Sequence, residues 1–291
     1  MFKYGFMFVM LSLLCGLTVA ATTEGCRDIP GVEVLFQRAT TRVIWVGEGH
    51  GTVELPAMFG DLVCIASSKG KPVVVALERS QDDQALWDAF MASDGGAAAR
   101  EKLLKGVDSN SQDGRSSEAM FDLAERLRQY KYQGRIFGVQ LIIEPFKAGA
   151  DLSHFAADHE AGMAHAVMEI ISKQPNVLVL VYSGNVHAMK TIAPYDKTIA
   201  LAASLVPGSE IISVNLLGGE GEFWGCMKTE TVECKSYHTQ GSNHPREIVL
   251  TSDVTDQAGR DNSAGFDAIG YTGTKTTASP PAVKSQEQSA K

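Results

Sequence analysis

The stretch RVIWVGEGHGTVELP, residues 42–56, joins the pattern of a buried strand to that of a helix start. After Arg42, residues 43–46 are apolar toward both faces, which is typical of a strand inside a parallel sheet. The glycines between residues 47 and 51 permit backbone conformations that are closed to other residues, and Pro56 suits the first turn of a helix. We therefore expect a strand, a loop and a helix, with the loop presenting the carboxylate of Glu48 beside the imidazole of His50.

The same alternation of short apolar runs and amphipathic segments continues along the chain. Buried strands are predicted at residues 42–46, 72–77, 135–139 and 177–182, and two later strands at residues 211–216 and 247–251. Helices are predicted between them, at residues 56–67, 82–91, 116–130 and 152–173. Strand, helix and strand in repetition predict an α/β fold of three layers, with a mostly parallel central sheet and helices on both faces.

The N-terminal segment has the pattern of a secretory signal peptide. Lys3 precedes an apolar run over residues 6–17, and small residues follow at positions 18–21. We predict that residues 1–20 are a cleaved signal peptide, with an uncleaved N-terminal anchor as the alternative. Cleavage would leave no membrane segment and an exported protein, either periplasmic or secreted.

Composition limits the rest of the chain and its partners. We predict a single domain over residues 21–271. A Ser/Thr/Pro-rich tail over residues 272–291 is predicted to be disordered, because its composition cannot supply a core. The 34 acidic against 26 basic side chains, and the lack of any Lys or Arg run, exclude nucleic acid as a partner. A small-molecule or peptide substrate remains, and the oligomeric state is left open.

Five cysteines are present, and Cys15 would leave with the signal peptide. The remaining four suggest two disulfides in an exported protein, with three possible pairings. The short spacing favours a bond between Cys226 and Cys234, which leaves Cys26 for Cys64. A redox pair is less favoured because no Cys-x-x-Cys motif occurs.

Polar side chains follow the predicted strands at the ends where parallel sheets form their ligand crevice. We expect these side chains at one rim, in strand order: Glu48 with His50, Glu78, Gln140, and Asn185 with His187. For Glu78 an ion pair with Arg79 or Arg115 is an equally good explanation, and His50 could simply bond its own loop. A buried carboxylate is costly unless it is paired or coordinated, so the convergence of the set favours a functional site.

Two chemistries suit such a set, because the motifs of serine hydrolases and of nucleotide-binding loops are missing from the sequence. In the first, His50 acts as a general base on water, within the catalytic set Glu48, His50, Glu78 and His187. In the second, a divalent metal (Zn, Mn or Co) lowers the pKa of bound water. The predicted metal ligands are Glu48, His50, Glu54, His159 and His187, and the predicted cofactor-binding residues are Arg115, Gln140 and Asn185.

Two motifs together resemble a known superfamily. GEGHGTVELP at residues 47–56 and GNVHA at residues 184–188, with Glu78 after the strand between them, are similar to motifs shared by erythromycin esterases, ChaN-type haem-binding uptake proteins and Tiki/TraB proteases. The resemblance implies an α/β fold of the EreA/ChaN type with its site at these strand ends. It implies general-base chemistry at His50 in the esterase branch, metal-ligating histidines in the Tiki branch, and haem ligation in the ChaN branch.

The chain departs from the esterase pattern in two places. One residue, Gly49, separates the Glu and His of the first motif where the esterases have two, and His159 with Glu160 stands where an Arg-Asp pair is expected. The additional histidine favours a metal. We therefore expect an exported hydrolase, esterase-like or peptidase-like, that binds a divalent metal. The alternatives are a periplasmic haem- or iron-binding uptake protein without catalysis, and an inactive member that contacts other proteins.

Overall fold

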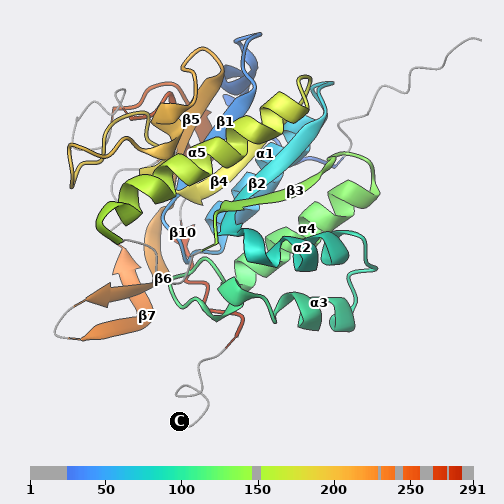
Figure 1. The fold of residues 1–291 in the computed structure, drawn as a ribbon, viewed down its shortest axis with the longest axis vertical. Helices are drawn as coiled ribbons and strands as arrows, with labels where there is room; N and C mark the ends of the chain where they lie inside the picture. The colour runs from blue at the N-terminus through green and yellow to red at the C-terminus, as the bar shows by residue number, and fades with distance from the viewer. Residues whose placement is uncertain are drawn as a thin grey trace, which may run out of the picture.

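A computed structural model describes residues 25–145, 152–228, 231–239, 245–255, 265–273 and 275–283. Its centre is a seven-stranded sheet with the strand order β3-β2-β4-β1-β5-β9-β8, parallel throughout except for the β8–β9 pair (Figure 1). The strands are β1 Val43–Glu48, β2 Val73–Ser80, β3 Gly138–Ile143, β4 Leu178–Gly184, β5 Ile211–Leu217, β8 Ile248–Thr251 and β9 Ala268–Thr272. The predicted α/β fold with a mostly parallel sheet is confirmed.

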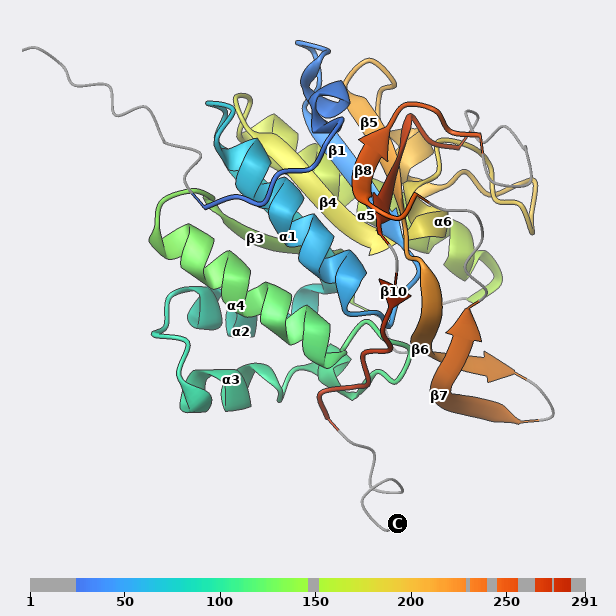
Figure 2. The same ribbon diagram turned by 180° about the vertical axis from the view of Figure 1, so that it is seen from behind.

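Helices cover both faces of this sheet, as Figures 1 and 2 show from opposite sides. One face carries α1 Glu54–Ser67, α2 Gln84–Met91, α3 Ala97–Leu103 and α4 Glu118–Tyr132, and the other carries α5 Phe155–Lys173 and α6 Asn185–Ala188. The 3₁₀ helices are η1 Val32–Phe36, η2 Gln81–Asp83, η3 Val107–Asn110, η4 Leu152–His154 and η5 Ala202–Leu205.

Strand β1 shows why its sequence is apolar on both faces from Val43 to Val46. Ile44 and Val46 pack into the core beneath α1 and α4, whereas Val43 and Trp45 pack into the core beneath α5. Successive side chains of a strand point to opposite faces, so a strand covered on both sides needs apolar residues throughout. All six residues of β1 are buried, including Glu48 at its end.

A second, three-stranded sheet stands beside the first and was not predicted. It consists of β6 Glu220–Lys228, β7 Val232–Thr239 and the short β10 Lys275–Thr276, in the order β10-β6-β7. The β6–β7 hairpin is closed by the disulfide Cys226–Cys234, and the disulfide Cys26–Cys64 ties the N-terminal segment to α1. Both favoured pairings are therefore confirmed.

The third strand lies further along the chain than predicted. The apolar character that begins at Ile136 continues to Ile143, and the strand occupies only the second part of this run, Gly138–Ile143. Gln140 is therefore in the middle of an edge strand, beside Ala76 of β2, with an exposed side chain. The prediction that Gln140 ends the strand at the rim of the site is wrong.

The predicted C-terminal tail is wrong for residues 275–283. These residues include β10 and are joined to two loops by backbone hydrogen bonds. Their backbone groups find partners in those loops, so a segment with few apolar side chains is still held in place. The predicted signal peptide and residues 284–291 lie outside the described residues. Within the described part of the chain, no helix is long and apolar enough to cross a membrane.

Candidate functional site

The sheet order brings the polar strand ends together. Strands β2, β4 and β1 are neighbours, so Glu78 near the end of β2, Gly184 at the end of β4 and Glu48 at the end of β1 lie at one edge. Helix α6 starts directly after β4 and carries His187. It packs closely on β1 because Gly47 has no side chain, and a Cβ there would lie 2.7 Å from Asn185 Cα.

A buried carboxylate holds His50. Its Nδ1 atom lies 2.9 Å from Oε1 of Glu48, whose side chain is buried at the end of β1. The Tyr182 hydroxyl faces the same carboxylate, and burial and the charge of Glu48 raise the pKa of Tyr182 well above its ordinary value. Burial alone lowers the pKa of His50, but the hydrogen bond to Glu48 and the charge of Glu78 outweigh it, so this pKa is raised. The Nε2 atom of His50 is left to face the site.

The same arrangement recurs at His187. Its Nδ1 atom lies 2.7 Å from Oε1 of Glu160, a buried residue of α5. The other oxygen of Glu160 accepts a hydrogen bond of 2.8 Å from the backbone N–H of Ala202. Burial lowers the pKa of His187, but the hydrogen bond to Glu160 and the charge of Glu78 outweigh it, so its pKa is raised.

Glu78 lies between the two imidazoles. Its Oε2 atom is 3.7 Å from Nε2 of His50, and its Oε1 atom is 3.7 Å from Nε2 of His187. Arg115 donates to Oε1 at 3.3 Å, and the backbone N–H of Gly184 donates to Oε2 at 2.5 Å. Burial alone raises the pKa of Glu78, but the two imidazoles and Arg115 outweigh burial, so its pKa is lowered and the carboxylate is ionised.

His159 stands next to this centre on the α5 side. Its ring lies 5.5 Å from that of His187, edge to face. Glu78, His159 and His187 each offer one ligand atom within 4.8 Å of the others. Burial and the neighbouring His187 lower the pKa of His159, which favours the neutral form that binds metals. One carboxylate and two imidazoles, with Glu160 behind one of them, are a donor set that fits a divalent metal such as zinc.

Other predicted residues take different places. Glu54 accepts a hydrogen bond from the backbone N–H of Thr277 at 2.9 Å and is not part of the Glu78, His159 and His187 group. Arg115 reaches the site and also pairs with Asp113 at 2.7 Å. Asn185 is half-buried at the start of α6.

Glu160 is the site residue that sequence reasoning missed. Three and four residues further along α5 are Met163 and Ala164, and both are buried. A carboxylate on the apolar stripe of a helix must have a polar partner, since burying it alone is very costly. The position of Glu160 in the sequence, on the apolar stripe of a predicted helix, therefore indicated a buried polar partner.

The loop that carries His50 is fixed from outside the main sheet. The carbonyl oxygen of Gly51 accepts hydrogen bonds of 2.8 Å from the backbone N–H groups of Trp224, on β6, and of Ser279. The indole N–H of Trp224 donates to the carbonyl of Gln112 at 2.9 Å, in the loop that leads to Arg115. Gly51 has φ +90° and lies so close to Trp224 that a Cβ would clash with its carbonyl, so only glycine fits there.

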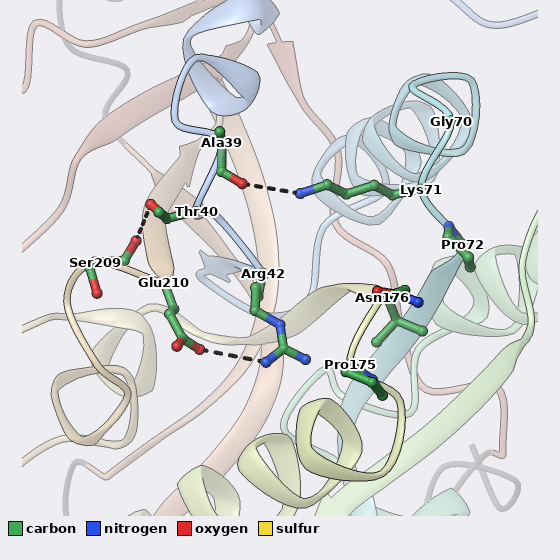
Figure 3. Close-up of a pocket in the computed structure, with 11 residues that line it drawn as sticks. Ala39, Thr40, Arg42, Gly70, Lys71, Pro72, Pro175, Asn176, Ser209 and Glu210 are labelled. Atoms are coloured by element: carbon green, nitrogen blue, oxygen red, sulfur yellow. Dashed lines mark hydrogen bonds and ion pairs between the residues drawn. The ribbon is translucent and has the colours of Figure 1, made fainter.

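A pocket of about 550 Å³ lies at the opposite end of the sheet, near the amino ends of β1, β2, β4 and β5 (Figure 3). Its charged groups are engaged with nearby protein atoms: Lys71 donates to the carbonyl of Ala39, and Arg42 lies 4.0 Å from Glu210. The pocket holds none of the site residues Glu48, His50, Glu78, His159, Glu160 and His187, so the candidate site is the group at the carboxyl ends of the strands.

No protein-family model and no curated protein matches the sequence. Solved structures do match the fold. A mutant of the erythromycin esterase EreC in its open conformation is 11% identical, with a TM-score of 0.62 over 82% of this chain and 92% of that one. A succinoglycan biosynthesis protein is 13% identical, with a TM-score of 0.61 over 83% and 90% of the two chains. A protein from Bacillus cereus is 11% identical, with a TM-score of 0.56 over 84% and 91%.

These likenesses concern the fold, because the identities are low. They confirm that the chain has the α/β fold of erythromycin esterase, as its motifs predicted.

Proposed function

We propose that the protein is an exported hydrolase that cleaves an ester or a related acyl bond with water activated by His50. One observation carries the proposal: two histidines, each held at Nδ1 by a buried carboxylate, direct their Nε2 atoms to the two oxygens of Glu78. The shared fold of an esterase supports it, and the two disulfides support export.

In this reaction Nε2 of His50 takes a proton from water as the water oxygen attacks the acyl carbon. The imidazolium that forms is stabilised by Glu48 and Glu78, which lie 2.9 and 3.7 Å away. His187, held at Nδ1 by Glu160, donates a proton from Nε2 in its protonated form to the leaving oxygen, and proton exchange with solvent restores both histidines for the next turnover. Arg115, at 31% side-chain exposure, is the cation placed to stabilise negative charge on the acyl oxygen.

Metal-assisted hydrolysis is the second candidate, and the Glu78, His159 and His187 group favours it. These three residues would hold the ion, and Glu160 would orient His187 as carboxylates orient metal-bound histidines. A bound Zn, Mn or Co ion would lower the pKa of water.

His159 separates the two candidates, because it belongs to the metal group but is not needed by the base mechanism. The experiment uses untagged full-length protein, a panel of aryl and alkyl esters and peptides, and the variants His50→Ala and His159→Ala. If His50 acts without metal, His50→Ala lowers kcat/KM by roughly 10²-fold or more, and His159→Ala and a chelator change it little.

If a metal is used, the protein contains about one ion per chain, and both His159→Ala and chelation remove the ion and the activity. Two results contradict the proposal as a whole: wild type that cleaves none of the panel, or a His50→Ala variant as active as wild type. The haem-binding alternative stays a prediction, and titration with haem, read as a Soret shift, tests it separately.

A further inference from the structure

Residues 275–283, here called the C-terminal strap, lie across the two loops that carry site residues. Figure 2 shows β10 and the residues that follow it beside the starts of α1 and α4. The strap pairs with Thr52 through Ala278 and with Ser117 through Pro281, both as antiparallel bridges. One bridge is on the His50 side and the other on the Arg115 side, so the strap spans both loops.

On the first side the strap bonds the segment that follows His50. The backbone N–H of Val53 donates to the carbonyl of Thr277 at 3.0 Å, and the N–H of Thr277 donates to the Glu54 carboxylate at 2.9 Å. The N–H of Ser279 donates to the carbonyl of Gly51 at 2.8 Å. These bonds fix the backbone from the residue next to His50 into the first turn of α1.

On the second side the strap supplies the cap of α4. Ser117, at the N-cap position, makes no capping bond with its own side chain. Instead the Ser279 hydroxyl accepts a hydrogen bond of 3.0 Å from the N–H of Ala119, and the carbonyl of Pro280 accepts one of 3.0 Å from the N–H of Glu118. The first N–H groups of a helix have no partner within the helix, so here a segment about 160 residues away in sequence satisfies two of them.

Two polar residues of the strap are buried, whereas Thr277 and Pro280 are exposed. Ser279 is 1% exposed and Thr276 is 3% exposed. Ser279 alone reaches both loops, with its backbone N–H on Gly51 and its hydroxyl on Ala119. The two loops carry His50 and Arg115, the side chains that contact opposite oxygens of Glu78.

The geometry points to the strap as a positioning element of the active site, with Ser279 as the positioning residue that couples the His50 loop to the Arg115 loop. This inference rests on the proposed function, because it assigns the strap a role in that reaction. Ser279 does not contact the reacting atoms. It acts by keeping His50 and Arg115 in register with Glu78, and small displacements of catalytic groups cost large factors in rate.

The test uses four full-length variants. Ser279→Ala removes the hydroxyl that caps α4, and Ser279→Thr keeps it. Glu54→Gln weakens the attachment of the strap on the His50 side, because it removes the charge of the group that accepts from Thr277. Thr277→Ala is the matched control, because it removes an exposed hydroxyl from the same segment while the backbone bonds of Thr277 remain. Circular dichroism shows whether each variant is folded. If Ser279→Ala does not fold, Glu54→Gln still tests the inference.

Two measurements are made on each variant: backbone hydrogen exchange, and kcat and KM on an ester that wild type cleaves. We expect Ser279→Ala to speed exchange over residues 113–121, and Glu54→Gln to speed it over residues 50–55. Each should lower kcat by about tenfold with little change in KM. Ser279→Thr should keep kcat close to the wild-type value, and Thr277→Ala should match wild type in both hydrogen exchange and kcat.

The inference is overturned if exchange rises only within the strap, or if Thr277→Ala has the same effect as Ser279→Ala. It is also overturned if exchange rises in the loops while kcat is unchanged. Hydrogen exchange needs no substrate, so it decides whether the strap couples the loops even if wild type cleaves no ester. In that case the proposed function fails while the coupling is still measured.

Discussion

The carboxylate of Glu160 bridges Nδ1 of His187, at 2.7 Å, and the backbone N–H of Ala202, at 2.8 Å. The second bond fixes the carboxylate, so the first fixes both the tautomer and the orientation of the imidazole. Nε2 is then the only ring nitrogen that can face Glu78. Glu48, at the end of β1, does the same for His50, so the site presents two oriented imidazoles.

Replacing Glu160 with Gln should impair catalysis more than stability. The variant keeps the size of the side chain but loses the charge that supports a protonated His187. Loss of such an orienting carboxylate typically lowers activity by about 10- to 100-fold, and we expect kcat/KM on an ester substrate to fall within this range. Glu169→Gln is the control, because Glu169 is an exposed residue of the same helix, paired with Lys173. Equal effects from the two variants would contradict a role for Glu160 in the site.

The pH dependence of the reaction should report His50. As a base it must be neutral, and its pKa lies above the ordinary 6.5 because the hydrogen bond to Glu48 and the charge of Glu78 outweigh burial. The acidic limb of kcat/KM should therefore have its midpoint above pH 6.5. Glu48→Gln should move this midpoint to lower pH, because burial then opposes fewer charges. An unchanged midpoint in this variant would argue against His50 as the titrating base.

The raised pKa of His50 also makes stability depend on pH, in the direction opposite to activity. A histidine whose pKa is raised on folding stabilises the folded chain fully below the unfolded pKa, and this contribution is lost as the pH rises through the folded pKa. Activity should therefore rise over the pH range in which the contribution of His50 to the free energy of unfolding declines. Chemical denaturation of wild type and of Glu48→Gln across this pH range measures the contribution of His50 to the free energy of unfolding.

Gly184 keeps the centre of the site open. A Cβ at this position would lie 3.2 Å from Nε2 of His50, 3.4 Å from the ring of His187 and 3.5 Å from Oε2 of Glu78. Its backbone, with φ −54° and ψ 144°, suits any residue. Gly184→Ala should thus fold with a small loss of stability, because the ring of His50 must shift by a few tenths of an ångström, and lose roughly 10²-fold in kcat/KM.

Gly49→Ala is the matched control for that variant. Gly49 lies between Glu48 and His50, its φ is not in the left-handed region, and a Cβ there would meet nothing within 4 Å. Its activity should stay within a few-fold of wild type. If Gly184→Ala retains full activity, water and substrate do not use the space between the two imidazoles.

The sequence predicted the central strands because burial on both faces leaves an unambiguous pattern. It failed for β3, where the apolar run is longer than the strand and only pairing with β2 sets the start at Gly138. It also failed for residues 275–283, whose partners are backbone groups of loops more than 150 residues away. Local composition carries no information about such distant bonds.

The positions of the candidate site residues were predicted to a similar extent. Strand ends identified Glu48, Glu78 and His187, since the order of a parallel sheet places them by rule. Arg115 came from a polar loop and does contact Glu78. Glu160 could be found only by noticing a carboxylate on an apolar stripe, and Glu54 was misjudged because its partner, Thr277, comes from the strap.

The two disulfides should separate stability from activity. Cys26–Cys64 spans 38 residues and Cys226–Cys234 spans 8. The entropy of loop closure then predicts losses in the free energy of unfolding of about 4 and about 2.5 kcal/mol when each pair is replaced by serine. For kcat we expect the opposite order, with the larger loss when Cys226 and Cys234 are replaced. The hairpin closed by Cys226–Cys234 carries Trp224, whose backbone and indole N–H groups donate to the carbonyls of Gly51 and Gln112, on either side of the site. The bond Cys26–Cys64 instead joins the segment before η1 to helix α1.

Each double variant is the control for the other. We expect Cys26→Ser/Cys64→Ser to lose more stability in denaturant titration but to keep kcat at temperatures where it is folded. Cys226→Ser/Cys234→Ser should lose less stability and more kcat, because a looser hairpin relaxes the hold of Trp224 on the His50 loop. If activity instead follows the order of stability in the two variants, the hairpin supports only the fold and takes no part in positioning the site.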